Sequence, residues 1–164
     1  MGQIPITGEE RRAIDTIARY QFRLPQSVAF LPVTEDIEVL HSRSGRIDRI
    51  YLADERMGTV TTNGRLTLGG AGGRRLHELC EPPHNRVAVT QEAVPYVGVG
   101  SNTFAKFVSE VDPGIRPRDE VVIVDVDDRP IAVGRAELSA AGMRSFERGM
   151  AVSVRSGLLD TEPA

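Results

Sequence analysis

The chain has 164 residues, of which 40% are hydrophobic and 26% charged, and its net charge is −3 at pH 7. This length fits one ordinary domain or two small ones, and with five Phe, three Tyr and no Trp the core must be mainly aliphatic. The acidic balance excludes a polycationic protein, so any nucleic-acid site must be a local cluster of cations.

Other compartments and scaffolds are also disfavoured. The single cysteine, Cys80, excludes a disulfide framework within the chain. No stretch approaches the roughly 18 apolar residues that a membrane helix requires, and the first residues lack the basic and apolar regions of a signal peptide. We therefore expect a cytoplasmic protein without a membrane partner.

The first half of the chain predicts a helix followed by short strands. Thr7 is suited to cap a helix that extends to Arg23, and Glu10 lies in its first turn. Asn63-Gly64 predicts a hairpin turn, because both residues tolerate positive φ. The expected strands are 37–40, 47–52, 57–60 and 66–68. A glycine-rich bend over 69–73 and a helix over 74–81 are expected to follow them.

A domain boundary is expected near residues 82–85. Pro82-Pro83 is rigid and has no amide donors, and it lies between a predicted helix and a new strand. The sequence therefore predicts an α+β domain over 1–82, a second domain over 83–158 and a C-terminal tail over 159–164.

The second half predicts a small β-barrel with helical turns. The segment 120–126 is almost continuously apolar, which favours a buried central strand. Ser139 is suited to cap a helix that extends to Arg148, with Met143 and Phe146 on its inner face and Gly149 at its end. The other expected elements are strands at 86–89, 104–111, 131–138 and 151–154, a short helix at 91–96 and a loop at 97–103.

Several motifs occur in this half in a fixed order. They are Arg86-Val-Ala-Val, Gly100-Ser-Asn-Thr-Phe-Ala-Lys-Phe-Val, Asp112-Pro-Gly-Ile-Arg-Pro, Asp119-Glu-Val-Val-Ile-Val, Ala132-Val-Gly-Arg-Ala and Gly149-Met-Ala-Val-Ser-Val-Arg. With these motifs, residues 86–157 resemble a PUA domain. The resemblance implies a PUA-type β pseudo-barrel that binds RNA.

The variant Asn102-Thr-Phe-Ala-Lys is most similar to the PUA domain of archaeal archaeosine tRNA-guanine transglycosylase and its archaeosine-synthase relatives. Residues 18–22 and 42–47 resemble the small α+β domain that precedes PUA there. The resemblance implies tRNA as the partner, while the large catalytic barrel of those enzymes is not in this sequence. Arg118 departs from the family, which usually has Gly there; it either alters the turn or adds a cation beside the barrel.

The loop 98–103 is the candidate RNA site. Gly98 and Gly100 let the backbone approach a phosphate or ribose closely. Lys106 follows on the adjoining strand and is placed to meet a phosphate. The polar side chains in the loop are Ser101, Asn102 and Thr103. The resemblance adds Arg155 and Arg148, because in PUA domains this loop and the last strand flank the RNA groove.

Other constellations carry weaker signals. His77, Cys80 and His84 lack the fourth ligand of a structural zinc site. Asp125, Asp127 and Asp128 lack the glycine and distal Glu of a calcium loop and are expected to form a solvated turn. We predict no metal, no cofactor and no catalytic residue.

The sequence thus favours a non-catalytic protein that binds tRNA or another structured RNA, with no DNA expected. A transglycosylase-like or other tRNA-modifying enzyme is the protein partner that the resemblance implies. Two alternatives stay open. One is an RNA-modification enzyme with its site in residues 1–82. The other is a protein-interaction subunit of a tRNA-modifying complex. The arginines of residues 1–82 form either solvated surface or a second RNA contact. The arginines in question are Arg11, Arg12, Arg43, Arg46, Arg49, Arg74 and Arg75.

Overall fold

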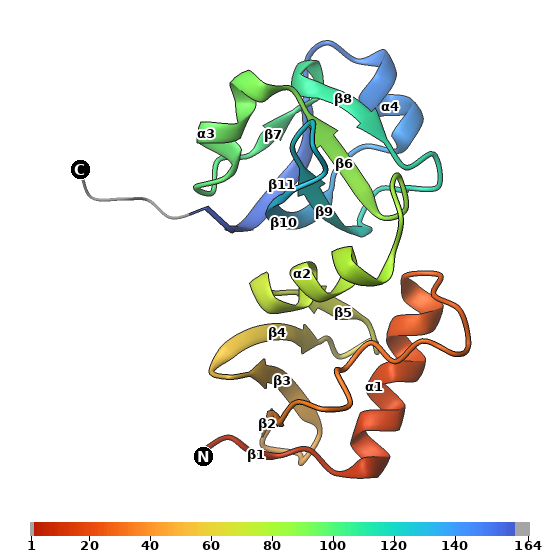
Figure 1. The fold of residues 1–164 in the computed structure, drawn as a ribbon, viewed down its shortest axis with the longest axis vertical. Helices are drawn as coiled ribbons and strands as arrows, with labels where there is room; N and C mark the ends of the chain where they lie inside the picture. Colours follow the sequence, from red (N-terminus) through yellow and green to blue (C-terminus); the bar gives the residue numbers. More distant parts are fainter. Residues whose placement is uncertain (1, 160–164) are drawn as a thin grey trace, which may run out of the picture. The chain divides into compact units, whose positions relative to one another are not determined.

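The structure is a computed structural model that describes residues 2–159. The chain divides into two compact units, an N-terminal unit of residues 1–79 and a C-terminal unit of residues 80–164 (Figure 1). Of the expected tail 159–164, only Leu159 is among the described residues. Within residues 2–159, no helix is both long enough and apolar enough to cross a membrane.

The N-terminal unit is an antiparallel meander with two helices. Its sheet has the order β1-β2-β3-β4-β5, so each strand pairs with the next one along the chain. Phe22 and Phe30 stack at 6.2 Å between ring centroids and lie in the core with Ile50, Met57 and Leu76. The elements are β1 (Ile4–Pro5), α1 (Gly8–Gln21), β2 (Ile37–His41), β3 (Ile47–Leu52), β4 (Glu55–Val60), β5 (Leu66–Leu68) and α2 (Gly70–Leu79).

The start of α1 is fixed by the predicted cap. The Thr7 hydroxyl accepts from the Glu10 amide at 3.1 Å, and the Glu10 carboxylate accepts from the Thr7 amide at 3.0 Å. The second carboxylate oxygen lies 2.7 Å from Nε2 of His41 on β2. The Thr7 amide above all, and then His41, lower the pKa of Glu10 below its ordinary value. The capping signal in the sequence is confirmed, and His41 ties the helix to the sheet.

The hairpin between β4 and β5 forms at the predicted place, with a different turn. Gly64 has φ +79°, and its amide donates to Thr61 at 3.0 Å, but Asn63 is not among the residues with positive φ. Three residues therefore connect Thr61 to Arg65, a loop in which only the last residue is left-handed. The hairpin predicted at Asn63-Gly64 is therefore confirmed, although only Gly64 uses its tolerance of positive φ.

The glycine-rich segment is helical rather than a bend. Helix α2 begins at Gly70, four residues before the predicted start. A Cβ on Gly72 would overlap the carbonyl oxygen of Met57, and one on Gly69 would overlap that of Arg56. These glycines therefore allow α2 to lie directly on the backbone of β4, which local sequence does not reveal.

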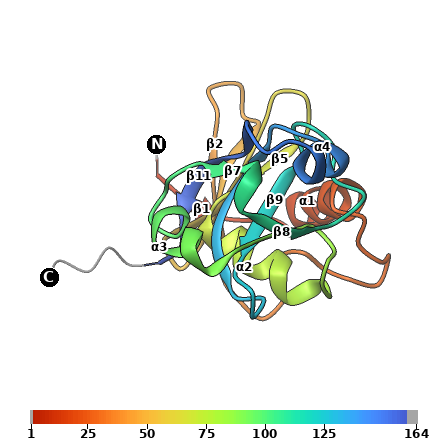
Figure 2. The ribbon, with the colours of Figure 1, turned by 90° about the horizontal axis from the view of Figure 1, so that it is seen from above.

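The C-terminal unit is a six-stranded sheet of order β7-β11-β10-β9-β6-β8 that curls around one core. Strands β6 and β9 are parallel, and the other pairs are antiparallel. Helices α3 and α4 lie on different sides of this barrel (Figures 1 and 2). The elements are β6 (Arg86–Val89), a 3-10 turn (Gln91–Ala93), α3 (Val94–Val97), β7 (Thr103–Phe104), a 3-10 turn (Ala105–Phe107), β8 (Val108–Val111), β9 (Glu120–Val124), β10 (Pro130–Ala136), α4 (Ala140–Ser145) and β11 (Met150–Gly157).

Two expectations for this unit were correct in kind and wrong in extent. The strand expected over 104–111 is interrupted by a 3-10 turn, because β7 pairs with β11 at one edge of the sheet while β8 pairs with β6 at the other. Helix α4 ends at Ser145 instead of Arg148, since the chain must turn back into β11. Phe146 consequently lies outside the helix and is 56% exposed, whereas Met143 is buried as predicted.

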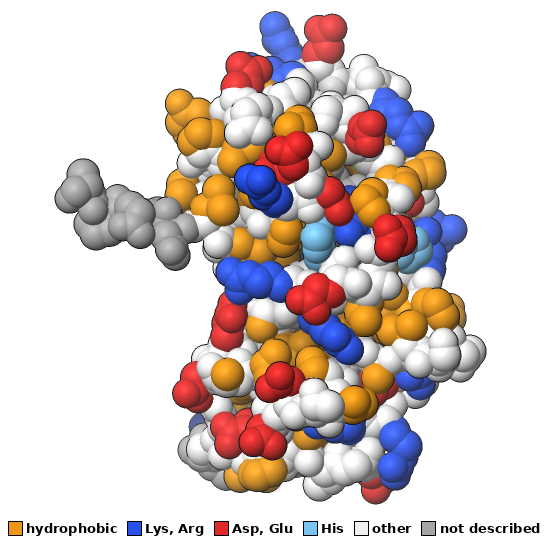
Figure 3. All heavy atoms as spheres, viewed as in Figure 1, with side chains coloured by type: hydrophobic (Ala, Val, Ile, Leu, Met, Phe, Trp, Pro, Cys, Tyr) orange, Lys and Arg blue, Asp and Glu red, His pale blue; other side chains and the backbone are white. Residues whose placement is uncertain are grey.

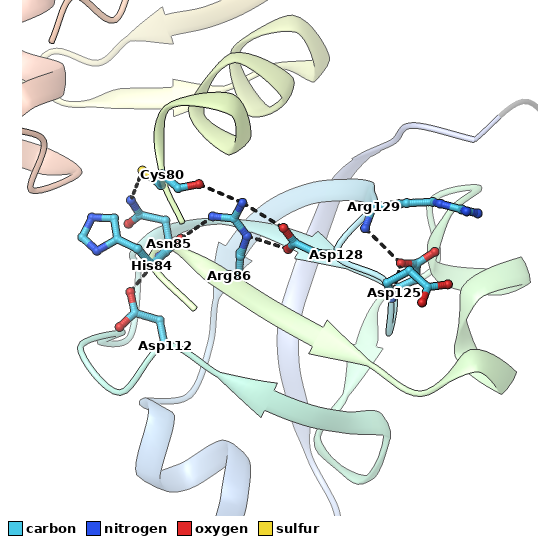
Figure 4. A network of polar contacts seen from close by, with 9 residues as sticks. Cys80, His84, Asn85, Arg86, Asp112, Asp125, Asp128 and Arg129 are labelled. Carbon is cyan, nitrogen blue, oxygen red and sulfur yellow. Dashed lines mark hydrogen bonds and ion pairs between the residues drawn. The ribbon is translucent and has the colours of Figure 1, made fainter. Parts of the chain in front are cut away.

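The entry into the barrel is held by a polar network around Arg86 (Figure 4). Its guanidinium is buried and makes an ion pair with Asp128, with Nε–Oδ1 at 2.6 Å, and it donates to the carbonyls of Cys80 and His84. Asp125 is also buried and accepts from the amides of residues 127 and 129, both at 2.9 Å. Of the acidic turn expected to be solvated, Asp127 is exposed as predicted, whereas Asp125 is buried and Asp128 pairs with Arg86.

Arg118 occupies the turn in a left-handed conformation, with φ +77°, and its amide donates to Ala136 at 2.7 Å. The turn that suits glycine is therefore retained, at the conformational cost of a side chain at positive φ.

We expect Arg118→Gly to raise the free energy of unfolding by about 1 kcal/mol, measured by denaturant titration. Arg116→Gly, at a neighbouring position without positive φ, should give no gain, and equal effects of the two would contradict the explanation.

Candidate nucleic-acid interface

The predicted site residues lie along one ribbon at the edge of the barrel. Residues 98–106 run antiparallel beside residues 148–157, and we call these two segments the edge ribbon. Thr103 pairs with Val152 and Phe104 with Met150, and the Ala105 amide donates to Gly149 at 2.9 Å. Because β7 is the edge strand of the sheet, the ribbon is at the sheet margin.

One end of the ribbon is built from glycines. A Cβ on Gly157 would lie 2.7 Å from the Gly100 amide nitrogen, and a Cβ on Gly98 would lie 2.9 Å from the Val94 carbonyl oxygen. These two glycines therefore serve close packing within the chain. Gly100 differs, because it has φ +116° and nothing within 4 Å of where a Cβ would be. The open space for a ligand is at Gly100, while Gly98 shapes the loop beneath it.

The polar side chains of the loop divide between solvent and the barrel. Ser101 is exposed, and its amide donates to Tyr96 at 3.0 Å. Asn102 is exposed too, but its Oδ1 accepts from the Val154 amide at 2.9 Å, which fixes the loop to β11. The Thr103 hydroxyl is buried without a hydrogen-bond partner among the described residues. The loop thus offers a ligand the Ser101 hydroxyl and the Asn102 amide nitrogen.

A groove lined by positively charged side chains lies at the other end of the ribbon. Exposed Lys106, Arg144 and Arg148 line it, with Glu147 as the one carboxylate, and its volume is about 540 Å³. Nζ of Lys106 lies 4.9 Å from the ring centroid of Phe107. The remaining lining residues of this cation groove are Ala105, Val108, Met143 and Phe146.

Arg144 was missed from the sequence, although a signal existed. It stands four residues before Arg148 in the helix expected there, so the two would share a face. The cation groove arises instead because α4 ends early and the following residues fold beside the 3-10 turn that carries Lys106.

Arg155 lies on the ribbon, and its guanidinium is directed to another part of the barrel. It makes a bidentate ion pair with Glu120, with Nη2–Oε2 at 2.9 Å. The Glu120 side chain is only 5% exposed and that of Arg155 is 27% exposed. Arg155 is not among the lining residues of the cation groove.

Several arginines of the N-terminal unit hold backbone in place. Arg11 donates to Pro32 at 2.9 Å, Arg19 to Val28 at 3.0 Å, and Arg75 to Phe30 at 2.8 Å. These bonds fix the coil between α1 and β2. On the face drawn in Figure 3, basic and acidic side chains are interspersed. Nucleic-acid binding on such a surface has to rely on local geometry.

Comparison with known proteins identifies both units. Residues 85–158 match the family of the PUA domain. Residues 85–158 form a PUA domain. Residues 12–83 match the patch-forming domain C2 of tRNA-guanine transglycosylase.

The chain is similar to tRNA-guanine(15) transglycosylases over most of its length. It is 43% identical to the one of Pyrococcus abyssi over 148 residues, which cover 90% of this chain and 25% of that protein. It is 38% identical to the one of Methanothermobacter thermautotrophicus over 159 residues, covering 96% of this chain and 24% of that protein. The chain thus spans about a quarter of the length of these relatives.

Solved structures share the fold over both units. A hypothetical protein of Pyrococcus horikoshii OT3 matches with a TM-score of 0.73 and 22% identity, over 98% of this chain and 96% of that one. A conserved PUA domain protein of Thermoplasma acidophilum matches with a TM-score of 0.68 and 23% identity, over the same shares. The expected α+β unit followed by a PUA pseudo-barrel is confirmed.

Proposed function

We propose that this PUA-domain protein binds tRNA along the edge ribbon and holds it for a tRNA-modifying enzyme of the transglycosylase kind, without catalysing a reaction itself. The observation that carries the proposal is the 43% identity to a tRNA-guanine(15) transglycosylase over 90% of the chain, through two successive domains of that protein family.

The edge ribbon has two features that suit an RNA end. At Gly100 the backbone is open, so a ribose or phosphate can approach the main chain, and Ser101 supplies a hydroxyl next to it. At the other end, Lys106, Arg144 and Arg148 supply positive charge for the following phosphates. The edge ribbon therefore offers an RNA strand a main-chain contact at one end and positively charged side chains at the other.

Loss of one cation should weaken binding and flatten its salt dependence. We expect Lys106→Ala to lower tRNA affinity and to reduce the slope of log K against log salt by about 0.7–0.9, the contribution of one phosphate contact. The measurement is fluorescence anisotropy of labelled tRNA at a series of salt concentrations. Arg129→Ala is the matched control, because Arg129 is exposed on the β9–β10 turn, outside the ribbon and the groove.

Equal slopes for both variants would contradict binding by the cation groove, and no tRNA retention by the unmodified protein at low salt would contradict the function. Catalysis is tested on the same samples by nucleoside mass spectrometry. An altered nucleoside produced by this protein alone would overturn its non-catalytic role, whereas a stable protein partner that survives nuclease treatment without any RNA binding would favour an interaction subunit.

A further inference from the structure

The N-terminal unit carries a second hollow, remote in sequence from the edge ribbon. It has a volume of about 530 Å³ and lies between α1 and the β4–β5 hairpin loop. This volume is in the range of about 300–1,000 Å³ that is typical of small-ligand sites. Its lining residues are Thr16, Ile17, Tyr20, Gln21, Asn63, Gly64 and Arg65.

The side chain that stands out in this hollow is Tyr20. It is 90% exposed, more than any other large hydrophobic side chain among the described residues. Single exposed apolar residues are common, but a nearly fully exposed aromatic ring beside a hollow offers both of its faces to a ligand. The ring is a platform on which a planar group can stack.

The floor of the hollow is rigid. The Gln21 side chain donates to the Leu66 carbonyl at 2.8 Å and accepts from the Leu66 amide at 2.8 Å, so that it joins α1 to β5 as a strand neighbour would. The hairpin loop is closed by the hydrogen bonds between Thr61 and Arg65. The platform and the loop opposite it are therefore held at a fixed separation.

The charge of the hollow selects the ligand. Arg65 is the one charged residue in its lining, and no carboxylate lines it. Arg12 is exposed on α1 one helical turn before Thr16, which lines the hollow, so a second cation lies next to it. A ligand with a planar ring and a negative group fits this arrangement. An apolar protein segment fits less well, because Ile17 and Tyr20 are the only large apolar side chains that line the hollow.

We infer that this hollow is a stacking site for one unpaired nucleotide of RNA, with the base on the Tyr20 ring and a phosphate near Arg65. The inference rests on the proposed function, because it supplies a second contact to the same class of ligand. The Thr16 hydroxyl already donates to the Arg12 carbonyl, so it faces the base as an acceptor.

The test compares variants of Tyr20 in the full chain, with two RNA probes. The probes are a fluorescent single-stranded octa-adenylate and a labelled tRNA transcript, both titrated by anisotropy. Tyr20→Ala should weaken octa-adenylate binding by about tenfold, because one stacked base contributes on that order. Tyr20→Phe should bind as the unmodified protein does, while Tyr20→Leu, which is apolar without a π face, should behave as Tyr20→Ala does. Because Tyr20 is exposed, all three variants should unfold at the same denaturant concentration as the unmodified protein.

The outcomes separate this inference from the function proposed above. Octa-adenylate binding that is unchanged in Tyr20→Ala, or that is retained in Tyr20→Leu, would overturn the stacking site, even if tRNA binding still depends on Lys106. Binding of octa-adenylate that depends on Tyr20 without any tRNA binding would support the stacking site and overturn the tRNA function. Failure to bind either probe would overturn both.

Discussion

Arg155→Ala should destabilise the protein by about 3 kcal/mol, because it leaves the Glu120 carboxylate buried without its counter-charge. Glu120 begins the central strand β9, and Arg155 reaches it from β11, across the intervening β10. The free energy of unfolding, taken from urea titration followed by circular dichroism, measures the effect. Arg155→Lys should recover part of the loss, since it restores the charge without the bidentate geometry.

The matched control is Arg135→Ala, which breaks the exposed ion pair with Glu137. Those side chains are 52% and 35% exposed, and surface pairs contribute about 1 kcal/mol or less. Similar losses for the two arginines would show that burial of Glu120 does not govern the effect. If Arg155→Ala instead left stability intact and abolished tRNA binding, Arg155 would be an RNA contact as the family resemblance implies.

Gly72→Ala should lower the free energy of unfolding by about 3 kcal/mol, although the same substitution in an exposed helix stabilises by about 1 kcal/mol. The new methyl group would overlap the Met57 carbonyl oxygen and would also lie 3.4 Å from Cδ2 of Leu68, so α2 would have to move away from β4. Thermal and denaturant unfolding followed by circular dichroism both measure the loss.

Gly8→Ala provides the comparison for this effect. Gly8 is the first residue of α1, and a Cβ there would meet only Nη1 of Arg12, at 3.5 Å. We expect that variant to be as stable as the unmodified protein or slightly more so. A Gly72→Ala protein that gained stability would mean that α2 does not pack on β4 as described.

The parts of the fold that follow from local chemistry were predictable from the sequence. The capping box at Thr7 and Glu10 satisfies amides within one helical turn, so it needs no tertiary partner to be recognised. Strands β3 and β5 were predicted to the residue, and the buried strand β9 was predicted from its continuous apolar run. The order of motifs in the C-terminal half identified the PUA fold and placed the candidate RNA loop on it.

Features that depend on distant backbone were not predictable in this way. The glycines of α2 predicted a bend, because their close contact with the backbone of β4 is not visible in the local sequence. The strand expected over 104–111 is divided, because its two parts pair at opposite edges of the sheet. The resemblance implied an RNA contact for Arg155, and nothing in the sequence indicated that its guanidinium pairs with Glu120 in the fold. Residue types along a chain specify turns, caps and apolar faces, but which carbonyl or carboxylate a side chain meets is set only when strands far apart in sequence become neighbours.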